Sequence, residues 1–184
     1  MRVISGKYKG KPLRAVQGMK TRPTSDKVKE AVFQLIGPYF EEGAVLDLYA
    51  GTGGLGIEAL SRGLDQAVFV DKHSQAVKVI KQNLHEAGVD EQTEVFRSEA
   101  KRALTALTKR QRSFDYIFMD PPYADDSIPG LLSIISEEKL LRPSGIIICE
   151  HAAGAELPAR IIRLEQQAVR RYGDTSISIY RTAE

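Results

Sequence analysis

The sequence predicts an α/β fold: a doubly wound, mainly parallel seven-stranded sheet with a C-terminal antiparallel hairpin, plus a small N-terminal β-hairpin/helix extension. Apolar runs of strand length alternate along the chain with amphipathic helical patterns, which is typical of right-handed βαβ units. The central runs are apolar throughout, as in strands buried on both faces. The 184 residues, 42% hydrophobic and 27% charged, have the composition of one globular domain.

The parallel part of the sheet is expected to contain five strands, over residues 45–48, 67–70, 93–97, 114–119 and 146–149. A helix is expected over residues 74–87, where Val77, Ile80 and Leu84 share one face and Gly88 ends the pattern. Residues 168–172 and 176–180 alternate apolar and polar side chains around Gly173-Asp174, which predicts the antiparallel hairpin.

The N-terminal segment differs from the rest of the chain in pattern and in charge. Short strands are expected at residues 2–4 and near Leu13, followed by a helix that starts near Ser25. We therefore separate a basic extension, residues 1–24, from a main domain, residues 25–184. Residues 1–30 contain nine basic and two acidic residues, a net charge of +7, whereas the remainder carries −5. This division indicates an arm that faces a polyanion, or else an ordinary solvated surface rich in lysine.

Several classes of protein are not favoured. The single cysteine, Cys149, cannot form an internal disulfide, and the spacing of the three histidines indicates no metal site. The N-terminus has no apolar signal region, and no apolar run reaches membrane-spanning length. We expect a cytoplasmic protein without a membrane partner, and nothing in the sequence requires more than a monomer.

A glycine-rich loop follows the first predicted strand. Gly51, Gly53 and Gly56 match the G-x-G-x-x-G pattern, and Asp71 follows about 20 residues later, where a ribose-binding acid belongs. A dinucleotide-dependent oxidoreductase is therefore one interpretation, and a glycine-rich connector without a ligand is another. Asp47 inside the strand argues against a diphosphate, because a carboxylate there would repel it but suits a ligand with an ammonium and a sulfonium.

Asp47 with Gly51 and Gly53 resembles the D-x-x-x-G-x-G signature of class I S-adenosylmethionine-dependent methyltransferases. The resemblance implies that this loop wraps the methionine part of the cofactor and that Asp71 holds the ribose hydroxyls. Ser98 and Glu99, after the third strand, then correspond to the adenine-contacting position. Glu99 is equally explained as an acidic residue at a helix N-terminus.

A second motif, Asp120-Pro121-Pro122-Tyr123, follows the strand over residues 114–119. It resembles the motif of methyltransferases that act on exocyclic amino groups of nucleobases or on amide nitrogens. The resemblance implies that Asp120 and the Pro121 carbonyl accept hydrogen bonds from the amine while Tyr123 stacks on the base. The target base must then be unpaired or flipped. Alternatively, the prolines only terminate the strand and Tyr123 covers the core.

Residues 1–13 and 21–33, taken together with both motifs, resemble the bacterial 16S ribosomal RNA guanine-N2 methyltransferase family. The resemblance extends over nearly the whole chain. Asp at position 120 also favours guanine slightly, because guanine presents adjacent N–H donors on its Watson–Crick edge. The resemblance implies S-adenosylmethionine as cofactor and 16S ribosomal RNA, or a small-subunit assembly particle, as partner. The residues expected to bind RNA are Lys7, Tyr8, Lys9, Lys11 and Arg22.

Other functions share parts of this pattern. A methyltransferase acting on adenine N6 of DNA or RNA, or on a protein amide nitrogen, uses the same two motifs, and a noncatalytic RNA-binding module would keep only the fold. A second basic cluster between residues 101 and 112 is interpreted as a solvated surface.

Overall fold

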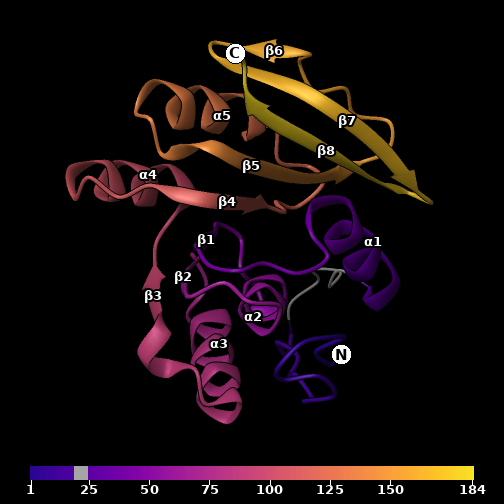
Figure 1. Ribbon diagram of the computed structural model, residues 1–184, viewed down its shortest axis with the longest axis vertical. Coiled ribbons are helices and arrows are strands. Elements are labelled where there is room, and N and C mark those ends of the chain that lie inside the picture. Colours follow the sequence, from indigo (N-terminus) through magenta and orange to yellow (C-terminus); the bar gives the residue numbers. More distant parts are fainter. Residues whose placement is uncertain (19–24) are drawn as a thin grey trace.

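The computed structural model describes residues 1–18 and 25–184, and its centre is one eight-stranded sheet in the order β3-β2-β1-β4-β5-β8-β7-β6 (Figure 1). The strands are β1 (Ala44–Asp47), β2 (Gln66–Asp71), β3 (Thr93–Arg97), β4 (Phe114–Met119), β5 (Leu141–Ala152), β6 (Arg160–Ile161), β7 (Leu164–Tyr172) and β8 (Thr175–Thr182). The helices are α1 (Asp26–Ile36), α2 (Gly54–Ser61), α3 (Ser74–Ala87), α4 (Ala100–Lys109) and α5 (Ile128–Glu137), with a 3-10 turn at Asp90–Gln92.

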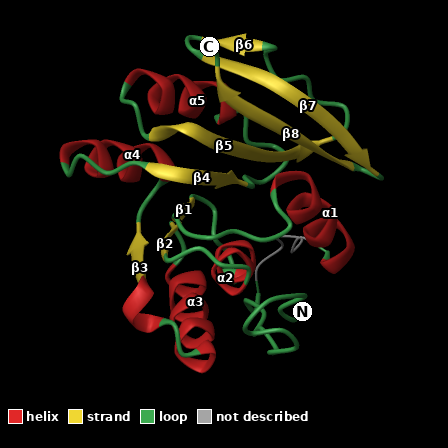
Figure 2. Cartoon of the chain, viewed as in Figure 1, coloured by secondary structure: helices red, strands yellow, loops and turns green. Residues whose placement is uncertain are grey.

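The first five strands pair in parallel, and β8, β7 and β6 add antiparallel strands at one edge. The chain passes outward from β1 through β2 to β3 and then returns to place β4 on the other side of β1. The strand order therefore reverses between β1 and β4, which is where open α/β sheets bind ligands. Helices lie on both faces of this sheet, as Figure 2 shows.

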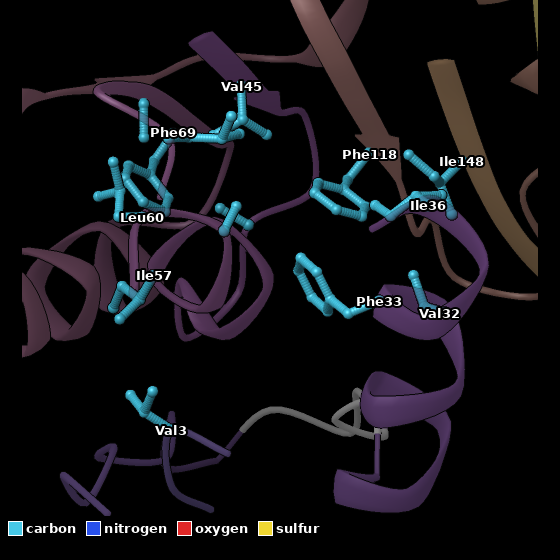
Figure 3. Packing of buried hydrophobic residues seen from close by; sticks show 14 of the residues in the cluster. Val3, Val32, Phe33, Ile36, Val45, Ile57, Leu60, Phe69, Phe118 and Ile148 are labelled. Carbon is cyan, nitrogen blue, oxygen red and sulfur yellow. The ribbon is translucent and has the colours of Figure 1, made fainter. Parts of the chain in front are cut away.

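Two hydrophobic clusters lie on the two faces of the sheet. Helices α1, α2 and α3 cover one face, where Phe33 packs against Phe118 with ring centroids 5.8 Å apart (Figure 3). Helices α4 and α5 cover the other face. Alternation along β1 explains both layers, since Val45 joins the first cluster and Leu46 the second. Gly56 lets α2 approach the sheet, because a Cβ there would lie 2.3 Å from the Phe69 ring.

The predicted fold class is confirmed, and the differences from the predicted elements have physical causes. The sheet has eight strands rather than seven, because the two-residue β6 pairs with the start of β7. The N-terminal β-hairpin is reduced to one antiparallel bridge between Arg2 and Pro12, formed by hydrogen bonds from Val3 N to the Lys11 carbonyl (2.9 Å) and from Leu13 N to the Met1 carbonyl (3.0 Å). The boundary placed at residue 24 lies outside the described residues.

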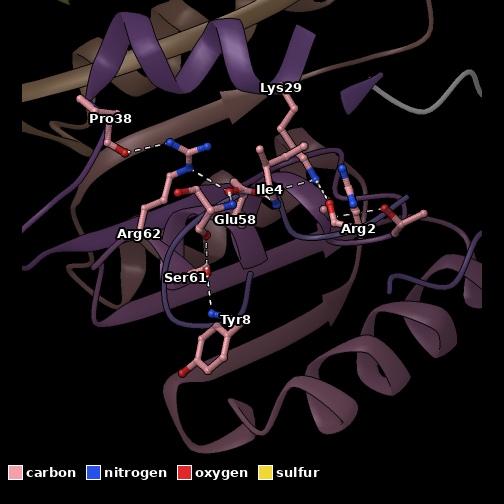
Figure 4. Close-up of polar contacts among 12 residues, drawn as sticks. Arg2, Ile4, Tyr8, Lys29, Pro38, Glu58, Ser61 and Arg62 are labelled. Atoms are coloured by element: carbon pink, nitrogen blue, oxygen red, sulfur yellow. Dashed lines mark hydrogen bonds and ion pairs between the residues drawn. The ribbon is translucent and has the colours of Figure 1, made fainter. Parts of the chain in front are cut away.

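The N-terminal segment, residues 1–18, is docked on helix α2 by backbone hydrogen bonds. Ser61 accepts at its carbonyl from Lys7 N (2.8 Å) and at its hydroxyl from Tyr8 N (2.9 Å), as Figure 4 shows in part. The Ser61 hydroxyl also donates to the Ser5 carbonyl at 2.6 Å. Gly6 permits this contact, because it adopts φ +93° and a Cβ would lie 2.0 Å from the Ser61 carbonyl oxygen.

A buried charge cluster joins the same segment to helices α1 and α2. Glu58 is fully buried and accepts from the backbone N–H groups of Ile4 (2.8 Å) and Ser5 (3.1 Å). It also pairs with Arg62 at 2.8 Å and Lys29 at 3.5 Å (Figure 4). Burial lowers the pKa of Lys29, and the charge of Glu58 opposes that shift. The N-terminal segment is thus part of the folded body.

Candidate active site at the sheet edge

A cavity of about 980 Å³ opens at the carboxyl ends of β1, β2 and β4, where the strand order reverses. Its volume is at the upper end of what small-molecule sites enclose. It brings together most of the residues that the sequence placed at a cofactor or catalytic site. Those that line it are Gly51, Asp71, Ser98, Glu99, Asp120, Pro121 and Tyr123.

The glycine loop between β1 and α2 turns through two left-handed residues. Gly51 has φ +57° and Gly53 has φ +83°, conformations that residues with a Cβ rarely adopt. Gly53 is also the N-cap of α2 and donates to the Ala50 carbonyl at 2.7 Å. A Cβ on Gly51 would meet no atom within 4 Å, so the loop leaves open space at the cavity wall. The backbone of Gly51 can therefore be approached closely by a ligand.

Asp47 lies behind this loop at the end of β1 and is 1% exposed. Its Oδ2 accepts from Gly56 N at 3.3 Å, while its buried Oδ1 has no hydrogen-bond partner among the described residues. Burial raises the pKa of Asp47 to about 7, the Gly56 hydrogen bond opposes the shift, and the charge of Asp71 adds to it. Asp47 is absent from the lining of the cavity, so its carboxyl group contacts the glycine loop through Gly56 and not the cavity itself.

Asp71 ends β2 and connects two backbone segments at the cavity. One carboxylate oxygen accepts from Gly51 N at 3.0 Å and the other from His73 N at 2.9 Å. The side chain is therefore held in one orientation, and each oxygen keeps a further lone pair for a hydroxyl group. This arrangement is compatible with the ribose-binding role that the sequence suggested.

The Asp120–Tyr123 segment leaves β4 and folds over the cavity with support from its own backbone. Pro121 is buried, and the Pro122 carbonyl accepts from Asp125 N at 2.8 Å. The Tyr123 hydroxyl hydrogen-bonds the Thr175 hydroxyl at the start of β8, and Tyr123 is 46% exposed. The ring is thus accessible at the cavity and does not cover the core, unlike in the alternative structural interpretation.

Ser98 and Glu99 line the cavity between β3 and α4. Glu99 occupies the N-cap position of α4 without a side-chain capping hydrogen bond, so it lies at the helix terminus and at the cavity together. Lys101 is exposed, as expected for the second basic cluster, and it also lines the cavity. Other members of that cluster follow the expectation, since Arg112 pairs with Glu94 at 2.8 Å.

Four of the five residues predicted to bind RNA are described by the structure, and these four lie outside the cavity. Lys7, Lys9 and Lys11 are exposed on the N-terminal segment, and Lys9 and Lys11 line a second hollow of about 500 Å³ beside α3. Tyr8 is half-buried and packs against the core cluster, so its ring is partly used in folding. Arg22 lies outside the described residues.

Sequence reasoning missed two walls of the cavity. The N-terminal segment contributes Met1, Ala15 and Val16, and the β7–β8 turn contributes Tyr172–Thr175. It also missed Asn83, a buried α3 side chain that donates to the Thr52 carbonyl (2.8 Å) and accepts from Arg14 N (2.8 Å). No local pattern marks these residues, because each acts only through distant segments.

The part of the chain that the structure describes was also searched for membrane-spanning helices and for metal sites. None of its helices is both long enough and apolar enough to cross a membrane. No group of three or more His, Cys, Asp or Glu side chains within it has the arrangement of a metal site.

This sheet order, the cavity at its reversal point and the two motifs define the class I methyltransferase fold. A solved structure titled "Putative methyltransferase yhhF from Escherichia coli" superposes with a TM-score of 0.83 and 25% identity, covering 100% of this chain and 99% of that one.

The chain belongs to the family described as conserved hypothetical protein 95, whose profile matches residues 1–181. It is 47% identical over 181 residues to "Putative rRNA methyltransferase YlbH" of Bacillus subtilis, covering 98% of each chain. It is 31% identical to "Ribosomal RNA small subunit methyltransferase D" of Haemophilus influenzae, covering 98% of this chain and 92% of that one. The methyltransferase family indicated by the two motifs is therefore confirmed.

Proposed function

We propose that this protein transfers a methyl group from S-adenosylmethionine to the exocyclic N2 of a guanine in 16S ribosomal RNA. The observation that carries the proposal is the placement of the glycine loop and the Asp120–Tyr123 segment on one cavity. A methyl donor and a planar base can then meet within a single site. The names of the relatives from Bacillus subtilis and Haemophilus influenzae support ribosomal RNA as the substrate.

The residues around the glycine loop fit the cofactor. The open space at Gly51 lets the cofactor approach the backbone of the loop, and Asp47 supports this loop from behind by accepting a hydrogen bond from Gly56 N. Asp71 is oriented to accept the ribose hydroxyls, and Ser98 with Glu99 borders the position for the adenine. When bound, the cofactor supplies an electrophilic methyl group on a sulfonium.

The catalytic segment prepares the amine to attack that methyl group. The lone pair of an exocyclic amine is delocalised into the base, so the nitrogen is a poor nucleophile. Asp120 and the Pro121 carbonyl accept hydrogen bonds from the amine N–H groups, which favours a localised lone pair directed at the methyl group. Tyr123 stacks on the base plane. A carboxylate at position 120 also accepts from the adjacent N1–H of guanine, which favours guanine over adenine.

The N-terminal segment supplies RNA affinity. Lys7, Lys9 and Lys11 are exposed on the same segment that supplies Met1 and Val16 to the cavity wall. Contacts of this kind bind phosphates and carry little sequence information. The choice of base is therefore made in the cavity, and the segment fixes where the RNA enters.

The decisive experiment incubates the protein with labelled S-adenosylmethionine and either naked ribosomal RNA or partly assembled small subunits. Product analysis by mass spectrometry is expected to find N2-methylguanine. Asp120→Ala should lose at least about 100-fold in transfer while calorimetry finds cofactor affinity nearly unchanged. Asp71→Ala should instead weaken cofactor binding. N6-methyladenine, a methylated protein amide, or full transfer by Asp120→Ala would contradict the proposal.

The RNA-binding role of the N-terminal lysines is tested by salt dependence. Replacing Lys7, Lys9 and Lys11 with glutamine should reduce the slope of log affinity against log salt by roughly one for each lysine that binds a phosphate. A matched control replaces Lys109 and Arg110 at the far end of α4. An equal slope for the triple variant and the wild type would remove these lysines from the RNA interface.

A further inference from the structure

The C-terminal hairpin reaches the proposed active site and contacts its aromatic residue. The turn between β7 and β8, Tyr172–Thr175, lines the same cavity as Asp120 and Tyr123. The hydroxyl groups of Tyr123 and Thr175 form a hydrogen bond across 52 residues of sequence. The sequence had indicated only that this hairpin closes the sheet. The contact makes the hairpin part of the substrate-binding wall.

Thr175 is held in a defined position by the sheet around it. It is 7% exposed and lies at the start of β8, opposite Ala152 of β5 and Tyr172 of β7. The Asp174 carbonyl beside it accepts from Ala153 N at 2.9 Å, which closes the turn onto β5. As a β-branched residue in a strand, Thr175 has few χ1 choices. Its hydroxyl therefore has a defined position.

Tyr123, in contrast, lies in an exposed loop. The residue is 46% exposed, and the neighbouring loop residues 122–126 are exposed as well. A tyrosine has two rotatable side-chain bonds, and a stacking ring is useful only in the orientation that matches the base. A hydrogen bond between the Tyr123 hydroxyl and a residue of β8 restricts the ring to one orientation before the base binds.

We propose that Thr175 is a positioning residue, which holds the Tyr123 ring at the angle that stacks on the substrate base. This inference rests on the proposed function of the cavity and assigns the C-terminal hairpin a role in base recognition. Phosphate contacts dominate RNA affinity, so a misplaced ring lowers the fraction of bound RNA whose base is engaged. The defect therefore appears in kcat and leaves KM for RNA nearly unchanged.

The test compares Thr175→Val, which removes the hydroxyl and keeps the shape, with Thr175→Ser, which keeps the hydroxyl. Loss of one hydrogen bond predicts a fall in kcat of about five- to ten-fold for Thr175→Val. Thr175→Ser should recover kcat to within about two-fold of the wild type. Thr182→Val, at the other end of β8, is the matched control and should leave kcat unchanged.

Tyr123→Phe removes the same hydrogen bond from the exposed loop, so it tests the contact even where Thr175→Val impairs folding. It should match Thr175→Val, and the double variant should be no slower than either single variant, since both lose one shared interaction. If the losses of kcat in the two single variants add in the double variant, or if Tyr123→Phe keeps the wild-type kcat, the inference is wrong while the proposed function still stands. A wild-type protein that transfers no methyl group to ribosomal RNA would overturn the proposed function, and the inference with it.

Discussion

Substituting Glu58 by alanine should destabilise the protein more than any surface substitution. Glu58 is fully buried, and the paired side chains of Lys29 and Arg62 are each 2% exposed. Glu58→Ala leaves both cations without their counter-ion and the N–H groups of Ile4 and Ser5 without their acceptor. Removing one partner of a buried ion pair costs about 3–5 kcal/mol, a large part of the roughly 5–15 kcal/mol that stabilises a domain.

Contacts that Lys29 and Arg62 keep in Glu58→Ala place the loss of unfolding free energy toward the lower end of that range. Lys29 Nζ still donates to the Arg2 carbonyl at 2.8 Å, and Arg62 still donates to the Pro38 carbonyl at 3.2 Å. The Arg62 guanidinium also lies 4.9 Å from the centroid of the Phe33 ring. Each contact continues to compensate part of the positive charge. A decrease of about 3 kcal/mol in the free energy of unfolding is therefore expected, which corresponds to roughly 6–12 °C in Tm.

Urea denaturation monitored by circular dichroism measures this change in the free energy of unfolding. Glu86→Ala is the matched control, because Glu86 pairs with Arg14 at 2.7 Å with side chains that are 43% and 59% exposed. That exposed pair should contribute under about 1 kcal/mol. A loss below about 1 kcal/mol in Glu58→Ala, equal to that of the control, would refute the assignment of Glu58 as the anchor of the N-terminal segment.

Two further predictions concern Asp47 and Gly6. Between about pH 4 and pH 7 folded Asp47 holds a proton that the unfolded chain has released, because burial raises its pKa to about 7. The free energy of unfolding should therefore fall with rising pH relative to Asp47→Asn, by up to about 1.4 kcal/mol per pH unit, and parallel curves would contradict the pKa shift. Gly6→Ala should destabilise by more than the about 1 kcal/mol expected for Gly10→Ala in a urea titration, since both have positive φ but only Gly6 abuts the Ser61 carbonyl. Equal losses would show that the close approach is unimportant.

Local patterns predicted the elements that position the site. The bounds of α3, β3 and β4 agree with the sequence expectation residue for residue, because apolar periodicity and Gly88 define the helix and short β-rich runs define the two strands. The glycine loop and the Asp120–Tyr123 segment are contiguous motifs at strand ends, so the fold class alone brings them to one edge. The placement of the predicted cavity residues follows from topology without any knowledge of side-chain packing.

Contacts between distant segments escaped prediction. β5 begins at Leu141 rather than at Ile146, although Pro143 and Gly145 are residues that strands usually exclude. A register shift opposite, between Phe114 and Tyr116 of β4, accommodates them. Such irregular pairing depends on the neighbouring strand. The hydrogen bond between Tyr123 and Thr175 was likewise not predictable, because the sequence around neither residue indicates a contact with the other.

The structure separates the positive charge of the described residues among the first thirty into two kinds. Lys29 is buried against Glu58, and Arg14 is paired with Glu86, so these charges hold the segment to the body. Lys7 and Lys9 are exposed, and the same segment supplies Met1 and Val16 to the cavity wall. Anchoring through Glu58 therefore also holds this part of the cavity wall in place, because Ile4 and Ser5 of the same segment donate to its carboxylate.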